Sequence, residues 1–179
     1  FFRDLKRHND RDWFEANKAR YERDVRGPLL TFIDAFAEPL YKLSPHFRAD
    51  ARKQGGSLFR IHRDVRFSAN KSPYKTHAGV HFRHERAKDV HAPGYYLHLD
   101  PDEVFVGVGI WHPERDTLAR IRQAILDRPA AWKKAVGGAP FRRRFELSGD
   151  ANKRPPAGVS ADHPLLADLK RKDYIALAD

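Results

Sequence analysis

The sequence contains no cysteine, which excludes disulfide bonds, thiol nucleophiles and zinc sites built on thiolates. It also contains no uninterrupted apolar run of about 18 residues, so no segment is predicted to cross a bilayer. No G-x-x-x-x-G-K loop occurs, and Gly107-Val108-Gly109 lacks the third glycine of a dinucleotide-binding fingerprint. The sequence therefore predicts neither a nucleotide cofactor nor any other cofactor.

The chain has 179 residues, of which 41% are hydrophobic and 32% are charged. This balance is typical of a globular protein, and the length is sufficient for one hydrophobic core. We therefore expect a single domain spanning residues 1–179. Because the chain begins at Phe1, inside a predicted helix and without an initiator methionine or a leader, we expect a truncated N-terminus and, by default, a cytoplasmic location.

Apolar residues at helical spacing predict three helices in the first 43 residues. Residues 1–8 form a short amphipathic pattern, and Asn9-Asp10 supplies an N-cap for the second helix. Arg26-Gly27-Pro28 is expected to break that helix, and Pro28 suits the first turn of the third. We expect the aromatic side chains of these helices to pack in the core, among them Trp13, Phe14 and Tyr21.

Period-two alternation predicts strands in the middle of the chain. Residues 58–62 alternate, with Phe59 and Ile61 on one face, and residues 77–85 alternate again. Residues 94–99 and 104–111 flank the turn Asp100-Pro101-Asp102-Glu103, which predicts a β-hairpin. We expect the hairpin strands to pair as neighbours and to share a sheet with residues 77–85.

The C-terminal part predicts helices beginning near His112 and at Pro129, an edge strand over residues 142–147 and a last short helix over residues 164–170. Helices thus come first, antiparallel strands follow, and further helices come last. This order indicates an α+β fold in which N-terminal and C-terminal helices pack against one antiparallel β-sheet.

The net charge of +10 is concentrated in one region. Residues 52–88 contain ten Lys or Arg and two acidic residues, whereas the rest of the chain contains 24 and 22, respectively. The region therefore carries +8, and the remaining residues carry +2. The positive charge is local and indicates a binding surface for an anion.

We name residues 58–76 the basic segment, because cationic side chains recur there among aromatic residues and turn formers. Guanidinium groups bind oxyanions in a bidentate manner, and lysines add point charges. The residues predicted to bind a ligand are Arg60, His62, Arg63, Asp64, Arg66, Lys71, Tyr74 and Lys75. The structural alternative is a solvated basic face in which Asp64 is the counter-ion.

Histidines fall on or beside several predicted strands, but the sequence has no H-E-x-x-H motif or comparable ligand spacing. We therefore predict no metal site. If a metal ion were bound, the trio most easily brought together would be His62, His81 and His98. No catalytic residue is predicted.

The basic segment is compatible with three functions. The first is binding of a phosphorylated or carboxylated small molecule, and the second is an unassigned enzyme acting on such a molecule. An enzyme would need convergent acid and base groups, such as His62 or His98 near Asp64. The third, non-specific nucleic-acid binding, is less favoured because no nucleic-acid-binding signature accompanies the charge. The oligomeric state is not indicated.

The stretch Phe59-Arg-Ile-His-Arg-Asp-Val-Arg-Phe-Ser-Ala-Asn-Lys-Ser-Pro-Tyr-Lys-Thr76 resembles the signature of a conserved hypothetical family, domain of unknown function 2461. Residues 9–14, 93–98, 107–111 and 149–165 are similar to that family's pattern in the same order. The resemblance extends over nearly the whole chain. It implies membership of a family without an established reaction, cofactor or catalytic residue.

Overall fold

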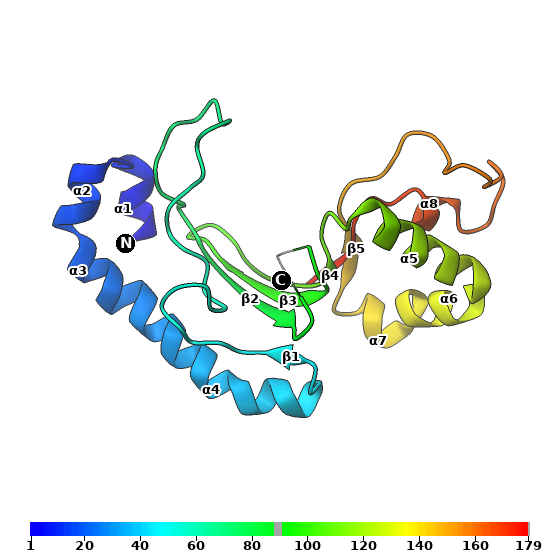
Figure 1. Ribbon diagram of the computed structural model, residues 1–179, viewed down its shortest axis with the longest axis horizontal. Helices are drawn as coiled ribbons and strands as arrows, with labels where there is room; N and C mark the ends of the chain where they lie inside the picture. Colours follow the sequence, from blue (N-terminus) through cyan, green and yellow to red (C-terminus); the bar gives the residue numbers. More distant parts are fainter. Residues whose placement is uncertain (88–90, 179) are drawn as a thin grey trace. The chain divides into compact units, whose positions relative to one another are not determined.

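The computed structural model describes residues 1–87 and 91–178 (Figure 1). Its helical elements are α1 (Phe2–Arg7), α2 (Arg11–Ala16), α3 (Lys18–Tyr21), the π-helix η1 (Glu22–Arg26), α4 (Gly27–Leu43), α5 (Arg115–Asp127), α6 (Pro129–Gly137), α7 (Ala139–Arg142) and α8 (Leu166–Leu169). Its strands are β1 (Phe47–Arg48), β2 (Ala78–His84), β3 (Gly94–Leu99), β4 (Val104–Ile110), β5 (Glu146–Ser148) and β6 (Tyr174–Ala178). None of the helices in these two described ranges combines the length and the apolar character that crossing a bilayer requires.

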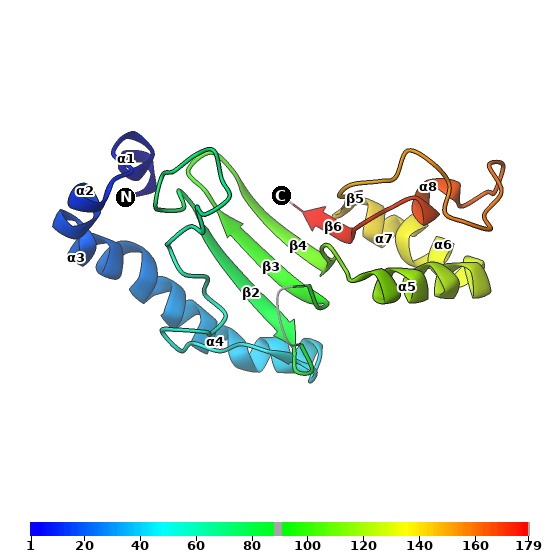
Figure 2. The same ribbon diagram turned by 45° about the horizontal axis from the view of Figure 1, so that its top comes forward.

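The predicted α+β fold is confirmed. One antiparallel sheet contains six strands in the order β1-β2-β3-β4-β6-β5. Figure 2 shows β2, β3 and β4 side by side. The predicted hairpin is present as β3 and β4, which are neighbours, and β2 lies beside β3 as expected. At the turn, the backbone N–H of Asp100 donates to the carbonyl of Glu103 over 2.9 Å.

Contacts within the chain group it into two compact units. The first unit contains residues 1–85 and 95–105, and the second contains residues 86–94 and 106–179. In the first unit, α4 covers one face of β2 and β3. Ile33 and Leu40 of α4 are buried against Val80 and Phe82 of β2. The alternate residues of β2 therefore point to the opposite face of the sheet.

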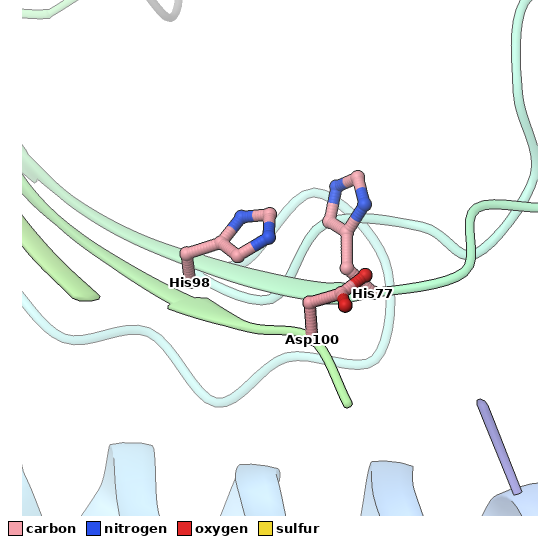
Figure 3. A group of neighbouring side chains, drawn as sticks. All are labelled: His77, His98 and Asp100. Carbon is pink, nitrogen blue, oxygen red and sulfur yellow. The ribbon is translucent and has the colours of Figure 1, made fainter. Parts of the chain in front are cut away.

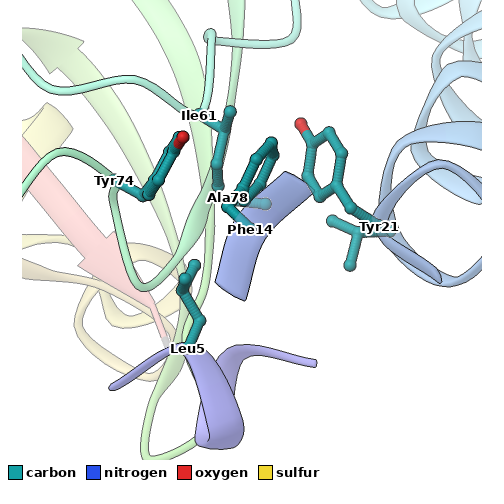
Figure 4. Packing of buried hydrophobic residues seen from close by; sticks show 7 residues of the cluster. Leu5, Phe14, Tyr21, Ile61, Tyr74 and Ala78 are labelled. Carbon is teal, nitrogen blue, oxygen red and sulfur yellow. The ribbon is translucent and has the colours of Figure 1, made fainter. Parts of the chain in front are cut away.

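A second cluster in the first unit joins the N-terminal helices to the basic segment. It consists of Leu5, Phe14, Tyr21, Val25, Ile61, Tyr74 and Ala78, most of which are labelled in Figure 4. The expectation that Phe14 and Tyr21 pack in the core is confirmed. The second helix begins as predicted, because the Asp10 carboxylate accepts a hydrogen bond from the backbone N–H of Trp13 over 2.8 Å.

The predicted helix break at Arg26-Gly27-Pro28 is wrong. The chain passes through η1 and continues into α4 without leaving helical geometry. The backbone N–H of Gly27 donates to the carbonyl of Glu22, and a Cβ at position 27 would lie 2.9 Å from that oxygen. Glycine therefore permits a wide turn here, and Pro28, which has no N–H to donate to the preceding turn, follows directly at the beginning of α4.

The predicted strand over residues 58–62 is also wrong. The segment makes two isolated β-bridges, Leu58 with Val80 and His62 with Tyr74. Leu58 packs in the α4 cluster and Ile61 in the N-terminal cluster, whereas Phe59 contacts the opposite face of the sheet. Between these two bridges the chain pairs with no neighbour as a regular ladder, so residues 58–62 do not keep the alternation of a strand.

In the second unit, α5 and α6 appear where they were predicted, and Leu118, Ile121 and Ile125 of α5 belong to its core. The predicted edge strand is present as β5, but it begins at Glu146, because the chain up to Arg142 is helical. The last short helix is α8. Strand β6, which pairs with both β4 and β5, was not predicted from the sequence.

Candidate functional site

The face of β2 and β3 that points away from α4 carries several histidine and tyrosine side chains. Period-two alternation brings His77, Gly79 and His81 to this face from β2 and its preceding residue, and Tyr96 and His98 from β3. Phe59, Lys75 and Phe105 contact or flank these side chains. We call this surface the histidine face.

Three side chains of the histidine face converge at one corner (Figure 3). His77 precedes β2 and Asp100 follows β3, so antiparallel pairing places them beside each other, with His98 adjacent. The rings of His77 and His98 have centroids 4.5 Å apart. One nitrogen of each ring and one oxygen of Asp100 all lie within 4.8 Å of one another.

The surroundings hold His98 in a defined orientation. The Tyr96 hydroxyl lies 3.1 Å from Nδ1 of His98, and the Phe105 ring stacks on the imidazole at 4.7 Å. Asp100 is also fixed, because its Oδ1 accepts hydrogen bonds from Nζ of Lys6 over 2.9 Å and from the backbone N–H of Asp102 over 3.0 Å. Burial, followed by the nearby charge of His98, lowers the pKa of His77.

His81 is the most deeply buried histidine of this face, with 8% of its surface exposed. Its ring lies among those of Phe59 and Tyr96. Within the described part of the chain, Nδ1 of His81 has no hydrogen-bond partner. Burial, followed by the charge of Arg83, lowers the pKa of His81 to about 4, so its imidazole is neutral at pH 7.

Lys75 and Arg60 are the two predicted ligand-binding residues that the structure brings together beside the histidine face. The ammonium of Lys75 donates to the carbonyl of Arg60 over 3.0 Å and lies 5.2 Å from the centroid of the Phe59 ring. Among residues 1–87 and 91–178, no carboxylate forms an ion pair with Lys75. Burial, followed by the charge of Arg60, lowers the pKa of Lys75.

Two other predicted cations contact the loop over residues 64–72. The guanidinium of Arg63 lies 3.4 Å from the carbonyl of Ser72 and 3.5 Å from the hydroxyl of Ser68. The ammonium of Lys71 donates to the carbonyl of Val65 over 3.0 Å. These cations therefore hold the loop in its conformation, which is a structural role.

Asp64 and Arg66 pair with each other through two hydrogen bonds of 2.9 and 2.6 Å. The guanidinium lowers the pKa of Asp64 to about 2, so this carboxylate is ionised at neutral pH. The same guanidinium lies 5.7 Å from the centroid of the Phe67 ring, which is 96% exposed. This pair corresponds to the structural alternative, in which Asp64 is the counter-ion.

Tyr74 and His62 lie on the side of the N-terminal helices. Tyr74 is buried, and its ring stacks on Phe14 with centroids 4.1 Å apart. The ring of His62 contacts those of Phe14 and Tyr74, whereas His81 and His98 belong to the histidine face. Within residues 1–87 and 91–178, the group of potential metal ligands that lie together is thus His77, His98 and Asp100, and not His62, His81 and His98.

Sequence reasoning missed the grouping of His77, Tyr96, His98 and Asp100. Alternation placed His77 and His81 on one face, but it says nothing about the register between neighbouring strands. A signal was available in the hairpin turn, because Asp100 follows β3 directly and His98 lies two residues before it. The missing information was the position of β2 relative to β3.

The fold is that of an α+β protein with an open antiparallel sheet. In its first unit, α4 covers one face of β2 and β3, and the other face of these strands carries imidazole, phenol and ammonium groups. The chain belongs to the DUF2461 family, described as a conserved hypothetical protein, whose model matches residues 1–179. This confirms the resemblance found in the sequence. No curated protein matched the chain, and no solved structure matched it.

Proposed function

We propose that the protein binds a small phosphorylated or carboxylated ligand at Lys75 and Arg60, beside the histidine face. The observation that supports the proposal most directly is the environment of Lys75. Its ammonium is partly buried, its hydrogen bond goes to the neutral carbonyl of Arg60, and a second cation lies beside it. An ammonium removed from water without a counter-ion is unfavourable, and an anion bound here would offset that cost.

Arg60 supplies the second half of such a site. It is exposed, and no carboxylate in the described residues forms an ion pair with its guanidinium. A guanidinium can bind a phosphate or carboxylate through two parallel hydrogen bonds, whereas the lysine contributes a point charge. The two cations together favour one oxyanion group over an extended polyanion. The pairing of Arg66 with Asp64 makes that arginine less available.

Calorimetric titration with inorganic phosphate, followed by small phosphorylated and carboxylated compounds, tests this proposal. We expect saturable binding that Lys75→Gln and Arg60→Gln each weaken about tenfold, which corresponds to about 1.4 kcal/mol for a lost charge-assisted contact. Arg66→Gln is the matched control in the basic segment, because its guanidinium is already paired, and it should have a smaller effect.

A second control comes from the second unit. Arg142, Arg143 and Arg144 line a cavity together with Glu146 and residues of β6, and they offer another cluster of guanidinium groups. If Arg143→Gln weakens phosphate binding while Lys75→Gln leaves it unchanged, the anion binds in the second unit and the proposal is wrong. Absence of saturable binding to every compound also contradicts it.

A catalytic function at the same surface is the second candidate. The contact between the Tyr96 hydroxyl and Nδ1 of His98 favours it, because it connects two groups able to transfer protons. Compounds that bind in the titration would be incubated with the protein and monitored for turnover. A product formed by the wild type but not by His98→Gln, with binding retained, would support an enzyme. Binding without turnover would support a binding module.

A further inference from the structure

We propose that His77, His98 and Asp100 bind one divalent transition-metal ion. Their candidate donor atoms, two imidazole nitrogens and one carboxylate oxygen, lie within 4.8 Å of one another. Ligand atoms about 2.1 Å from a common ion lie at most about 4.2 Å apart, so small side-chain rotations are sufficient. Figure 3 shows the two rings and the carboxylate at one corner of the sheet.

In many metal-binding histidines, the ring nitrogen that does not coordinate the ion has a hydrogen-bonding partner, and Nδ1 of His98 already has one. The Tyr96 hydroxyl lies 3.1 Å from Nδ1 and leaves Nε2 for an ion. Such an outer contact fixes the tautomer and the ring orientation of a ligand. Phe105, stacked on the imidazole at 4.7 Å, restricts its rotation further. His98 is therefore held in a fixed orientation, and its Nε2 can coordinate an ion.

Asp100 is constrained in a similar manner. Both of its hydrogen bonds, from Lys6 and from the backbone of Asp102, go to Oδ1. Oδ2 has no hydrogen-bond donor in the described part of the chain. The carboxylate can therefore keep its contact with Lys6 while Oδ2 coordinates an ion.

The local charge favours a cation, although the whole chain is basic. Three carboxylates gather at this corner, since Asp102 also pairs with Lys6 and Oε1 of Glu103 lies 3.7 Å from Nε2 of His98. Two ammonium groups oppose them, Lys6 directly and Lys75 through its charge on His77. Three negative and two positive charges leave a net negative charge, to which a divalent ion is attracted.

Two imidazole nitrogens and one carboxylate oxygen suit Zn²⁺, Co²⁺, Fe²⁺ or Ni²⁺ better than Ca²⁺ or Mg²⁺, which prefer oxygen ligands. Three protein ligands leave further coordination positions for water or a ligand. The metal proposal does not depend on the proposed function, because none of the three donors belongs to the anion site at Lys75 and Arg60.

The test uses chelator-treated protein without a histidine tag, titrated with Zn²⁺ by calorimetry and with Co²⁺ by visible absorption. We expect one saturable site per chain, with at least tenfold weaker binding in His77→Gln/His98→Gln and in Asp100→Asn. His46→Gln/His84→Gln is the matched control, because these two rings also stack, at 5.6 Å, beside a carboxylate, that of Glu85. It should bind as the wild type does.

A second measurement needs no substitution at the site. Paramagnetic Co²⁺ added to isotope-labelled wild-type protein should selectively shift or broaden the amide resonances of residues around 77 and 98–100. Strongest effects around residues 46 and 84, or uniform effects without saturation, would overturn the proposal. Equal Zn²⁺ affinity in the wild type and in a folded His77→Gln/His98→Gln variant would overturn it as well.

Discussion

At the scale of single residues, Asp173 is a buried charged group that joins several segments of the second unit. It is 1% exposed, and its carboxylate accepts hydrogen bonds from the backbone N–H groups of His112, over 2.6 Å, and Asp150, over 2.9 Å. His112 has a φ of 45°, an uncommon conformation for a residue with a side chain. One buried carboxylate therefore joins β6 to two irregular segments of the chain.

We predict that Asp173→Ala lowers the free energy of unfolding by about 2–5 kcal/mol, because two part-buried backbone N–H groups lose their acceptor. Urea denaturation followed by circular dichroism measures the loss. Asp162→Ala is the control, since this carboxylate is exposed and its side-chain partner is the hydroxyl of nearby Ser160. A similar loss in both variants would show that the buried hydrogen bonds of Asp173 are not the cause.

The buried imidazole of His81 predicts a loss of stability in acid. Its pKa is lowered from 6.5 to about 4 in the folded protein, mainly by burial and then by the charge of Arg83. The unfolded chain therefore binds the proton more tightly, and the contribution of His81 to stability, complete above about pH 6.5, is lost as the pH falls toward 4.

The pKa of His81 differs by about 2.5 between the unfolded and the folded chain, which corresponds to a stability contribution of about 3 kcal/mol. We expect the wild type to lose about that much more stability than His81→Phe between pH 7.5 and pH 4, measured by urea denaturation at each pH. Subtracting the variant removes the effect of the carboxylates, which titrate in both proteins. Parallel losses in the two proteins would contradict the assignment.

The charged residues show how far residue types alone predict a site. The sequence identified the cations of the basic segment, but their partners depend on the folded chain. Arg66 pairs with Asp64, two positions away, and Lys71 binds carbonyls of its own loop. Tyr74 is buried against Phe14, sixty residues earlier in the sequence. The first two contacts are local, and the alternative with Asp64 as the counter-ion was stated from the sequence. The packing of Tyr74 depends instead on contact between distant segments, which residue spacing does not encode.

At the scale of the elements, η1 and the glycine that follows it make a specific prediction. We expect Gly27→Ala to destabilise the protein, because the new Cβ would lie 2.9 Å from the carbonyl oxygen of Glu22. This clash opposes the gain of about 1 kcal/mol that alanine brings to a helix interior. We predict a net loss of about 1 kcal/mol or more, measured by thermal and urea denaturation.

Gly137→Ala is the matched control for that measurement. Gly137 is the last residue of α6, and a Cβ there would meet no heavy atom within 4 Å. We expect this variant to be neutral or slightly stabilising, so the two substitutions should have opposite signs. The π-helical geometry is not the reason for the glycine if Gly27→Ala is as stable as Gly137→Ala.

Elements with strong periodicity or turn signals were predicted from the sequence, namely α1, α4, α5, α6 and the hairpin of β3 and β4. The strand β6 was missed because Tyr-Ile-Ala-Leu-Ala is a short apolar run, which fits a strand or a helix equally well. Its pairing with β4 and β5 decides between them. Likewise, the two-residue strand β1 exists only through its pairing with β2.

At the scale of the whole molecule, the uneven charge distribution predicts how the protein meets a polyanion. Residues 52–88 carry +8 of the total of +10. Part of that charge is already neutralised by ion pairs, such as those of Arg52 with Asp50 and of Arg66 with Asp64. Long nucleic acid draws on a series of cations that spans several elements, whereas this concentration suits one or two oxyanion groups.

We therefore predict at most weak binding of single- or double-stranded oligonucleotides at about 0.15 M salt, where charges are screened within about 8 Å. Fluorescence anisotropy across a range of salt concentrations measures the affinity and its salt dependence. Each phosphate contacted adds about 0.7–0.9 to the slope of log affinity against log salt. Submicromolar binding with a slope that reports five or more phosphates would favour the nucleic-acid function instead.

The wide turn of η1 changes the direction in which the apolar side chains of the N-terminal helices point around the helix axis. Tyr21, Val25, Leu29 and Ile33 are spaced four residues apart and all contribute to the cores of the first unit. In an α-helix each such step advances about 40° around the axis, so the apolar stripe would wind away from the core. A π turn holds more residues per revolution and rotates the stripe back. The wider turn thus accommodates one extra residue, while the apolar side chains before and after it still face the cores of the first unit.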